Sequence, residues 1–106
     1  MSFTIGSRTF QGPFSGLSDI ADEPGVYVVV CPESGGSVLL VDVGQSANLR
    51  TTLKNHERKD CWARVCAAHA QAPEFGILYT RRISENYRRA VEQEIRNQYQ
   101  PPCGNV

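Results

Sequence analysis

Cysteine and histidine side chains gather in the second half of the chain, where they could bind a metal ion. Cys61, Cys66 and His69 follow one another with the spacing Cys-x4-Cys-x2-His, and His56 or Cys103 could add a fourth ligand. Thiolate and imidazole are ligands that zinc prefers, but zinc sites are best recognised by a closely spaced Cys-x-x-Cys pair, which is missing here. Buried thiols that pack as small hydrophobic groups are therefore the preferred interpretation.

Basic side chains are concentrated in the same half, and phosphate binding is the chemistry that suits them. Up to residue 49, one basic and five acidic side chains give a formal charge of −4, whereas ten basic and six acidic side chains from residue 50 onward give +4. Phosphate contacts depend on local rather than total charge, so a chain with no net charge can still bind a polyanion. The alternative is a solvated helix surface with ion pairs inside the protein.

Five of these basic residues are the candidates for nucleic-acid binding. They are Arg58, Lys59, Arg81, Arg82 and Arg88. The first two lie close to Trp62, so they could hold a phosphate backbone while a base stacks on the indole ring. A core tryptophan beside a charged loop explains the same pattern. The other three flank the start of a predicted last helix and form the best phosphate-contact patch, although a solvated surface remains the alternative.

Strand patterns predict a sheet with both faces covered. The β-branched runs at residues 26–31 and 38–43 are separated by a turn-rich segment and predict a hairpin, and residues 75–80 predict a third strand. The runs are almost continuously apolar, which indicates that helices pack on both sides of the sheet. The first 23 residues are expected to form an extension packed on the domain, with a short strand at residues 3–5 and one helical turn at residues 18–21.

Helical patterns occupy the intervals between and after these strands. Residues 49–56 carry apolar and histidine side chains on one face, residues 61–70 form a second amphipathic segment, and residues 84–99 form a long last helix. Pro101 and Pro102 end that helix. With 106 residues, the chain is expected to form a single α+β domain with one modest core.

Three motifs, in order along the chain, resemble the GIY-YIG nuclease domain. Residues 25–27 (Gly-Val-Tyr) lie on the first strand of the hairpin, and residues 42–44 (Asp-Val-Gly) end the second strand. The last helix carries Glu92, which is followed by Pro101 and Asn105. Each tripeptide alone is a weak signal, but their order and spacing together are more specific. The resemblance implies a small three-stranded antiparallel sheet flanked by helices, with an extension at residues 1–23 and the GIY-YIG-like domain at residues 24–106.

The same resemblance implies a metal-dependent endonuclease with catalytic residues Tyr27, His56 and Glu92. Phosphodiester hydrolysis needs an activated water and stabilisation of charge on the phosphoryl oxygens, to which a divalent cation contributes. Glu92 would hold one weakly bound Mg²⁺ or Mn²⁺ ion, Tyr27 would orient or deprotonate the attacking water, and His56 stands where many members carry an active-site histidine. Each residue also has a purely structural explanation. Tyr27 could be an aromatic side chain that fills one face of the hairpin, Glu92 a solvated helix carboxylate, and His56 a histidine that bonds locally at the end of a helix.

Two departures from the family pattern favour an alternative, a non-catalytic module that binds nucleic acid or a protein partner. Asp42 stands where the second tyrosine is usual, and Thr52 stands where the family carries the arginine that steadies the transition-state phosphate. A guanidinium from elsewhere would then have to fold into the site. The candidates for it are Arg58, Arg81, Arg82 and Arg88.

The expected partner is nucleic acid, with DNA placed ahead of RNA, and no membrane. The longest apolar run has six residues, far below the roughly 20 that a bilayer span needs, and the first residues do not resemble a signal sequence. These features predict a cytoplasmic protein. Because cytosolic thiol buffers keep cysteines reduced, no disulfide is expected.

Overall fold

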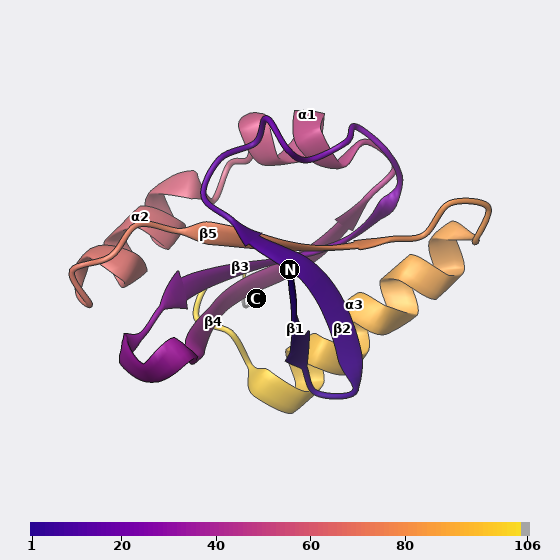
Figure 1. The fold of residues 1–106 in the computed structure, drawn as a ribbon. Coiled ribbons are helices and arrows are strands. Elements are labelled where there is room, and N and C mark those ends of the chain that lie inside the picture. The colour runs from indigo at the N-terminus through magenta and orange to yellow at the C-terminus, as the bar shows by residue number, and fades with distance from the viewer. Residues whose placement is uncertain (105–106) are drawn as a thin grey trace.

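The computed structural model describes residues 1–104, and these form an α+β fold with a curled antiparallel sheet (Figure 1). The strands are β1 (Ser2–Ile5), β2 (Arg8–Phe14), β3 (Gly25–Pro32), β4 (Val38–Ser46) and β5 (Glu74–Tyr79), in the spatial order β1-β2-β5-β3-β4. The helices are the 3-10 turn η1 (Ser34–Gly36), α1 (Leu49–Lys54), α2 (Lys59–Ala67) and α3 (Glu85–Tyr99). Asn105, the last residue of the family resemblance, lies outside the described residues.

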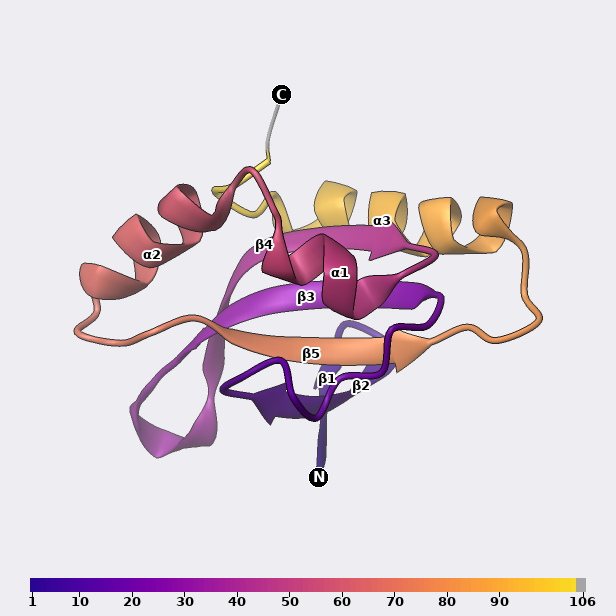
Figure 2. The ribbon, with the colours of Figure 1, turned by 90° about the horizontal axis from the view of Figure 1, so that it is seen from above.

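Strand β3 lies between β5 and β4, and its side chains supply both faces of the sheet. Successive side chains of a strand point to opposite faces, so Tyr27 and Val29 pack beneath α1 and α2, whereas Val26 and Val28 pack beneath α3. The two views of the ribbon show α1 and α2 on one face and α3 on the other (Figures 1 and 2). The prediction of helices on both faces is therefore confirmed.

The sheet has five strands rather than the three that were expected, because the N-terminal segment contributes a hairpin. The predicted short strand at residues 3–5 is confirmed as part of β1, which pairs with β2, and β2 in turn pairs with β5. Strand β2 was not predicted because Gly12 and Pro13 lie inside it, and both residues usually mark turns. The helical turn expected at residues 18–21 is a turn closed by one hydrogen bond, from the Ile20 amide to the Leu17 carbonyl.

A β-bulge in β4 brings an acidic residue to the same face as Tyr27. The register between β3 and β4 shifts, so that Val29 pairs with Asp42 while Val30 pairs with Leu40. The unpaired Val41 packs in the core beneath α1 and α2, and Asp42 contacts a side chain of α2 on that same face. Bulges often redirect side chains next to functional sites.

Helices α1 and α2 are shorter than the sequence pattern predicted. Helix α1 ends at Lys54, so His56 lies in the connection to α2 rather than on the helix. Helix α2 ends at Ala67, which leaves His69 exposed beyond it. Helix α3 agrees closely with expectation, and its first turn is capped by the Ser84 hydroxyl, which accepts a hydrogen bond from the Tyr87 amide. None of the helices described has the length and apolar character needed to cross a membrane.

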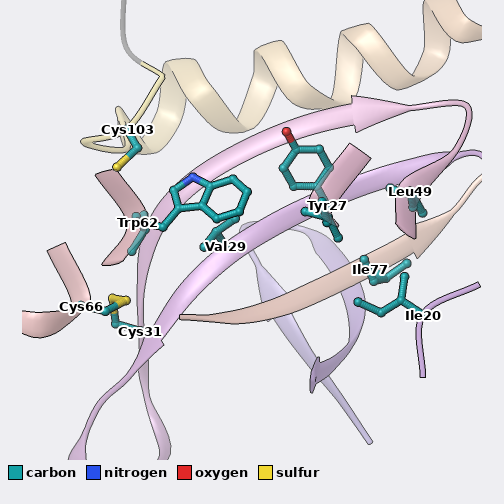
Figure 3. Close-up of a cluster of buried hydrophobic side chains, with 11 residues drawn as sticks. Ile20, Tyr27, Val29, Cys31, Leu49, Trp62, Cys66, Ile77 and Cys103 are labelled. Carbon is teal, nitrogen blue, oxygen red and sulfur yellow. A yellow bond between two sulfur atoms is a disulfide. The ribbon is translucent and has the colours of Figure 1, made fainter. Parts of the chain in front are cut away.

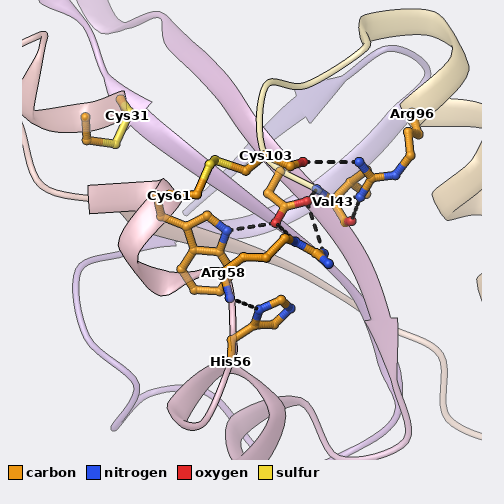
Figure 4. Close-up of a disulfide and its surroundings, with 10 residues drawn as sticks. Cys31, Val43, His56, Arg58, Cys61, Arg96 and Cys103 are labelled. Carbon is orange, nitrogen blue, oxygen red and sulfur yellow. Dashed lines mark hydrogen bonds and ion pairs between the residues drawn. A yellow bond between two sulfur atoms is a disulfide. The ribbon is translucent and has the colours of Figure 1, made fainter. Parts of the chain in front are cut away.

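Two disulfide bonds crosslink the side of the molecule that carries α1 and α2, so the expectation of reduced thiols is wrong. Cys31 of β3 is bonded to Cys66 of α2 (Figure 3), and Cys61 of α2 is bonded to Cys103 of the C-terminal segment (Figure 4). The expectation rested on the predicted cytoplasmic location, not on any property of the cysteines themselves. Because disulfides persist mainly in oxidising compartments, the pairing gives the predicted cytoplasmic location no support.

Candidate functional site

The Tyr27 hydroxyl and the His56 imidazole form a hydrogen-bonded pair at the centre of the candidate site. The distance from Tyr27 Oη to His56 Nε2 is 2.6 Å, and the two rings meet edge to face. His56 Nδ1 accepts a hydrogen bond from the backbone N–H of Arg58 at 3.1 Å. A neutral imidazole therefore carries its proton on Nε2 and donates it to the phenol oxygen, which leaves the phenol hydrogen free for another acceptor.

Both members of this pair are uncharged near neutral pH. Burial, followed by the nearby charge of Asp42, raises the pKa of the Tyr27 phenol above its usual value. Burial and the charge of Arg58 lower the pKa of His56. A neutral phenol and a neutral imidazole can orient a water molecule or a phosphate oxygen by hydrogen bonding.

Gly44 is required by the position of the Tyr27 ring. The two residues are direct partners across β3 and β4, and a Cβ atom at position 44 would overlap the phenol ring of Tyr27. Only glycine leaves space for the ring against the neighbouring strand. The tyrosine and glycine of the two sequence motifs are therefore two halves of one contact.

Asp42 is a fully buried carboxylate that binds three side chains, two from the start of α2 and one from α3. Figure 4 labels two of these partners, Arg58 and Arg96. Its oxygens accept hydrogen bonds from Arg58 Nε at 2.8 Å, from Trp62 Nε1 at 2.7 Å and from Arg96 Nη2 at 3.0 Å. The backbone N–H of Val43 donates to it as well, at 2.8 Å. A buried carboxylate needs such pairing, because an uncompensated charge in the interior is strongly unfavourable.

Glu92 lies on the face of α3 that approaches β4, with 28% of its side chain exposed. Its carboxylate is 3.8 Å from the guanidinium of Arg96, one helical turn further along. Burial raises the pKa of Glu92, and the charges of Arg96 and Arg58 oppose that shift. Of the three predicted catalytic residues, Tyr27 and His56 are in direct contact. Glu92 is connected to their surroundings through Arg96, which also binds Asp42.

A single partly exposed carboxylate is a donor set that Mg²⁺ and Mn²⁺ accept. Magnesium is commonly held by one or two carboxylates, with water and substrate phosphate completing its coordination. No cluster of three or more His, Cys, Asp or Glu side chains that could hold a metal ion occurs within residues 1–104, so an ion held by Glu92 would need water and substrate phosphate to complete its coordination. The zinc alternative is excluded for a different reason, because Cys61 and Cys66 belong to two separate disulfides.

Thr52, which stands where the GIY-YIG resemblance implies an arginine, forms a hydroxyl pair instead. Its Oγ1 lies 2.6 Å from Ser46 Oγ, which ties α1 to the end of β4. Arg58 instead brings a guanidinium to the site, through its bond to Asp42 and its backbone contact with His56. Thr52, His56 and Arg58 are among the residues that line an open depression of about 390 Å³ beside the Tyr27–His56 pair.

The other predicted nucleic-acid contacts lie in different environments. Arg81 is exposed and forms an ion pair with Glu23, and Arg82 is exposed in the connection between β5 and α3. Arg88 is 7% exposed and donates to Gln45 Oε1 at 2.9 Å. Lys59 is exposed, and its ammonium group donates to the Lys54 carbonyl.

Sequence reasoning missed that Arg96 and the indole of Trp62 both bind Asp42. Arg96 donates to Asp42 and to the carbonyls of Val43 and Cys103 (Figure 4). Trp62 is 1% exposed, so its interpretation as a core residue is confirmed, with the added function of binding Asp42. The four-residue spacing between Glu92 and Arg96 was the available sequence signal.

Comparison of the chain with protein-family models, with curated proteins and with solved structures found no match.

Proposed function

We propose that this protein is a GIY-YIG-like nucleic-acid phosphodiesterase, a metal-dependent endonuclease whose catalytic residues are Tyr27, His56 and Glu92. The observation that carries the proposal is the 2.6 Å contact between Tyr27 Oη and His56 Nε2, made by residues 29 positions apart in the sequence. The contact lies beside an open depression that Arg58 also lines. Arg58 binds Asp42, which also binds Arg96, the neighbour of the partly exposed Glu92 carboxylate. A phenol, an imidazole and a carboxylate are groups that can activate water and hold a divalent cation.

Tyr27 and His56 act on the attacking water in this proposal. The neutral phenol oxygen, which accepts a hydrogen bond from the Nε2–H group of His56, orients the water by hydrogen bonding and takes up the water proton while it passes its own hydrogen to a phosphoryl oxygen, so the phenol stays uncharged. Because the pKa of Tyr27 is raised, the phenol keeps its hydrogen in the resting site and can take up the water proton only as it gives that hydrogen away. Glu92 would hold one Mg²⁺ or Mn²⁺ ion, which supplies charge stabilisation at the phosphoryl oxygens.

Exposed basic residues would bind the nucleic-acid backbone around this site. Lys59 and Arg82 are exposed, and Arg81 remains exposed over most of its side chain despite its ion pair with Glu23. An exposed ion pair contributes little to stability, so Arg81 can exchange Glu23 for a phosphate at small cost. We place DNA ahead of RNA as the substrate on the basis of the family resemblance.

The alternative is a non-catalytic module that binds nucleic acid or a protein partner. The hydroxyl pair of Thr52 and Ser46 favours it, because a structural contact occupies the position of the family arginine. Asp42 favours it too, since this carboxylate replaces the second tyrosine and is fully engaged in holding other side chains. Under this alternative, the protein binds its partner without cleaving it.

A cleavage assay on a panel of DNA and RNA substrates, with Mg²⁺ or Mn²⁺, tests the proposal. Glu92→Gln and Tyr27→Phe are each expected to reduce cleavage by about a hundredfold or more, because each removes a group that acts on the reacting atoms. Glu85→Gln is the matched control, since Glu85 lies in the first turn of the same helix and forms only an exposed ion pair with Arg89. Cleavage that is the same in all three variants would reject the proposed site.

A further inference from the structure

Arg58 presents one edge of its guanidinium to the protein interior and the other edge to the candidate site. Its Nε donates to Asp42 Oδ2 at 2.8 Å, and its Nη2 donates to Asp42 Oδ1 at 3.4 Å. Within residues 1–104, Nη1 has no hydrogen-bond partner, and 29% of the side chain is exposed. The inner edge is therefore satisfied, while the outer edge offers one N–H group from each Nη atom.

The outer edge lies where an anion can reach it. Arg58 lines the open depression of about 390 Å³ together with Thr52 and His56. Its backbone N–H binds the imidazole that contacts the buried Tyr27, and His56 is the member of that pair that lines the depression together with Arg58. A planar guanidinium with two free N–H groups can bind two oxygens of one phosphate, which an ammonium group cannot match in geometry.

The neighbouring arginines lack this combination of position and free donors. Both Nη atoms of Arg96 already donate, Nη1 to the Cys103 carbonyl and Nη2 to Asp42, and only 16% of that side chain is exposed. Arg88 is buried against Gln45. The Asp42 carboxylate is shared between two guanidiniums, so its single negative charge does not neutralise both.

We propose that Arg58 binds a phosphate group of the substrate through its outer edge, and that Asp42 is the residue that positions it. This inference deepens the proposed function and rests on it for the identity of the substrate. Arg58, at the start of α2, would then supply the guanidinium that binds the phosphate, which Thr52 of α1 cannot supply. The ring of Trp62 and the main chain of Gly104 pack around the Arg58–Asp42 pair and hold it in one orientation.

Inorganic phosphate is the probe that tests the site without relying on cleavage. The chain has two histidines, so NMR can follow His56 in the site while the exposed His69 reports non-specific effects. We expect a saturable phosphate-dependent shift of the His56 signals and none at His69. Arg58→Gln is expected to weaken phosphate binding by about tenfold or more, because a charge-assisted hydrogen bond is lost. Arg58→Lys, which keeps the charge, should weaken it by a smaller factor.

Arg64→Gln is the matched control, because Arg64 is an exposed arginine of α2, the helix that Arg58 directly precedes, and its side chain forms no hydrogen bond within residues 1–104. It should leave the His56 shift unchanged. A shift of equal size in the Arg58→Gln and wild-type proteins, or a shift shared by His69, would overturn the proposal. If Arg58→Gln proves unfolded, the comparison of Arg58→Lys with Arg64→Gln decides the matter in the same way.

Cleavage assays separate this inference from the proposed function. If phosphate binds as described but no nucleic acid is cleaved, the endonuclease proposal fails while the phosphate site stands. If the wild-type protein cleaves and Arg58→Gln cleaves equally well, Arg58 has no part in catalysis. Asp42→Asn should weaken phosphate binding, because Asp42 positions Arg58. The double variant Arg58→Gln/Asp42→Asn should bind phosphate with the same affinity as Arg58→Gln alone.

Discussion

The two faces of the sheet are both closed by helices, but different interactions hold those helices in place. Under α3, the core consists of aliphatic and aromatic side chains such as Val28, Val43, Val91 and Ile95. Under α1 and α2, it contains two disulfides (Figures 3 and 4), the phenol of Tyr27 and the neighbouring buried carboxylate of Asp42.

Helix length explains this difference. Helix α3 has 15 residues and can bury a long amphipathic stripe, whereas α1 has 6 residues and α2 has 9. Short helices bury little apolar surface, so covalent bonds and buried charge pairs provide the remaining restraint. The crosslinked face is also the one that presents the Tyr27–His56 pair. Fixed side chains favour chemistry that depends on geometry, and the following predictions test whether the crosslinks provide that rigidity.

Reduction of both disulfides is expected to have the largest effect. They close loops with sequence separations of 35 and 42 residues, and each should contribute about 4 kcal/mol to the free energy of unfolding. Their combined loss is comparable to the total stability of a typical small domain. Urea unfolding, followed by circular dichroism with and without a thiol reductant, measures this loss. In hydrogen exchange, α2 should lose protection before α3, and equal loss in both helices would contradict the comparison.

Asp42→Ala is expected to cost about 3–5 kcal/mol in the free energy of unfolding, because it leaves two guanidiniums and an indole N–H without their shared acceptor. Asp42→Asn keeps an acceptor of the same shape and should cost less. Asp60→Ala is the control, since Asp60 is an exposed residue in the first turn of α2. Chemical denaturation of the three variants measures the differences. A small effect of Asp42→Ala would mean that the charge cluster does not hold the crosslinked face together.

Much of this architecture follows from local sequence patterns. The runs at residues 26–31 and 38–43 are rich in valine and leucine, and they form the β3–β4 hairpin as predicted. Helix α3 was predictable because a cap at Ser84 and a long amphipathic pattern agree with each other. Strand β2 was not predictable, since the local preference of Gly12 and Pro13 for turns is overridden by pairing with β1 and β5.

The candidate site was predictable only in its outline. Motif order brought Tyr27, His56 and Glu92 together as a hypothesis, but the contact between Tyr27 and His56 depends on a connection that follows the end of α1. The bulge that turns Asp42 toward Trp62 depends on the register of two strands, and so does its access to Arg58. Such register shifts and long-range ion pairs have no local sequence signature.

Ile95→Ala should destabilise the core beneath α3 and leave the site on the other face of the sheet unchanged. Ile95 is 1% exposed in the core beneath α3, and its truncation should cost about 3 kcal/mol of the free energy of unfolding by leaving a cavity. The Tyr27–His56 pair and the Arg58–Asp42 pair should remain in place, because the crosslinks on the other face are intact. Phosphate-dependent shifts of His56 should therefore match those of the wild-type protein. Loss of these shifts in a folded Ile95→Ala variant would show that the site depends on α3 packing instead.

Protonation of His56 should change the free energy of unfolding least, because it adds a single proton to the face that carries the disulfides. Burial and the charge of Arg58 lower the pKa of His56 in the folded protein. The unfolded chain, with an ordinary histidine pKa of about 6.5, therefore binds more protons as the pH falls. Stability contributed by neutral His56 is complete above that pH, decreases as the pH drops below it, and levels off below the folded pKa. The loss amounts to about 1.4 kcal/mol for each unit by which the pKa is lowered.

NMR titration of the two histidines measures this directly, with exposed His69 as the internal reference. Arg58→Gln should raise the pKa of His56, because it removes a positive charge that disfavours the imidazolium, and Arg64→Gln should leave it unchanged. Ile95→Ala should lower the whole curve of stability against pH without altering its shape, since it removes packing on the other face. If His56 instead titrates as His69 does, the imidazole is not held between Tyr27 and the Arg58 backbone. The crosslinked face would then lack the fixed geometry that its proposed chemistry requires.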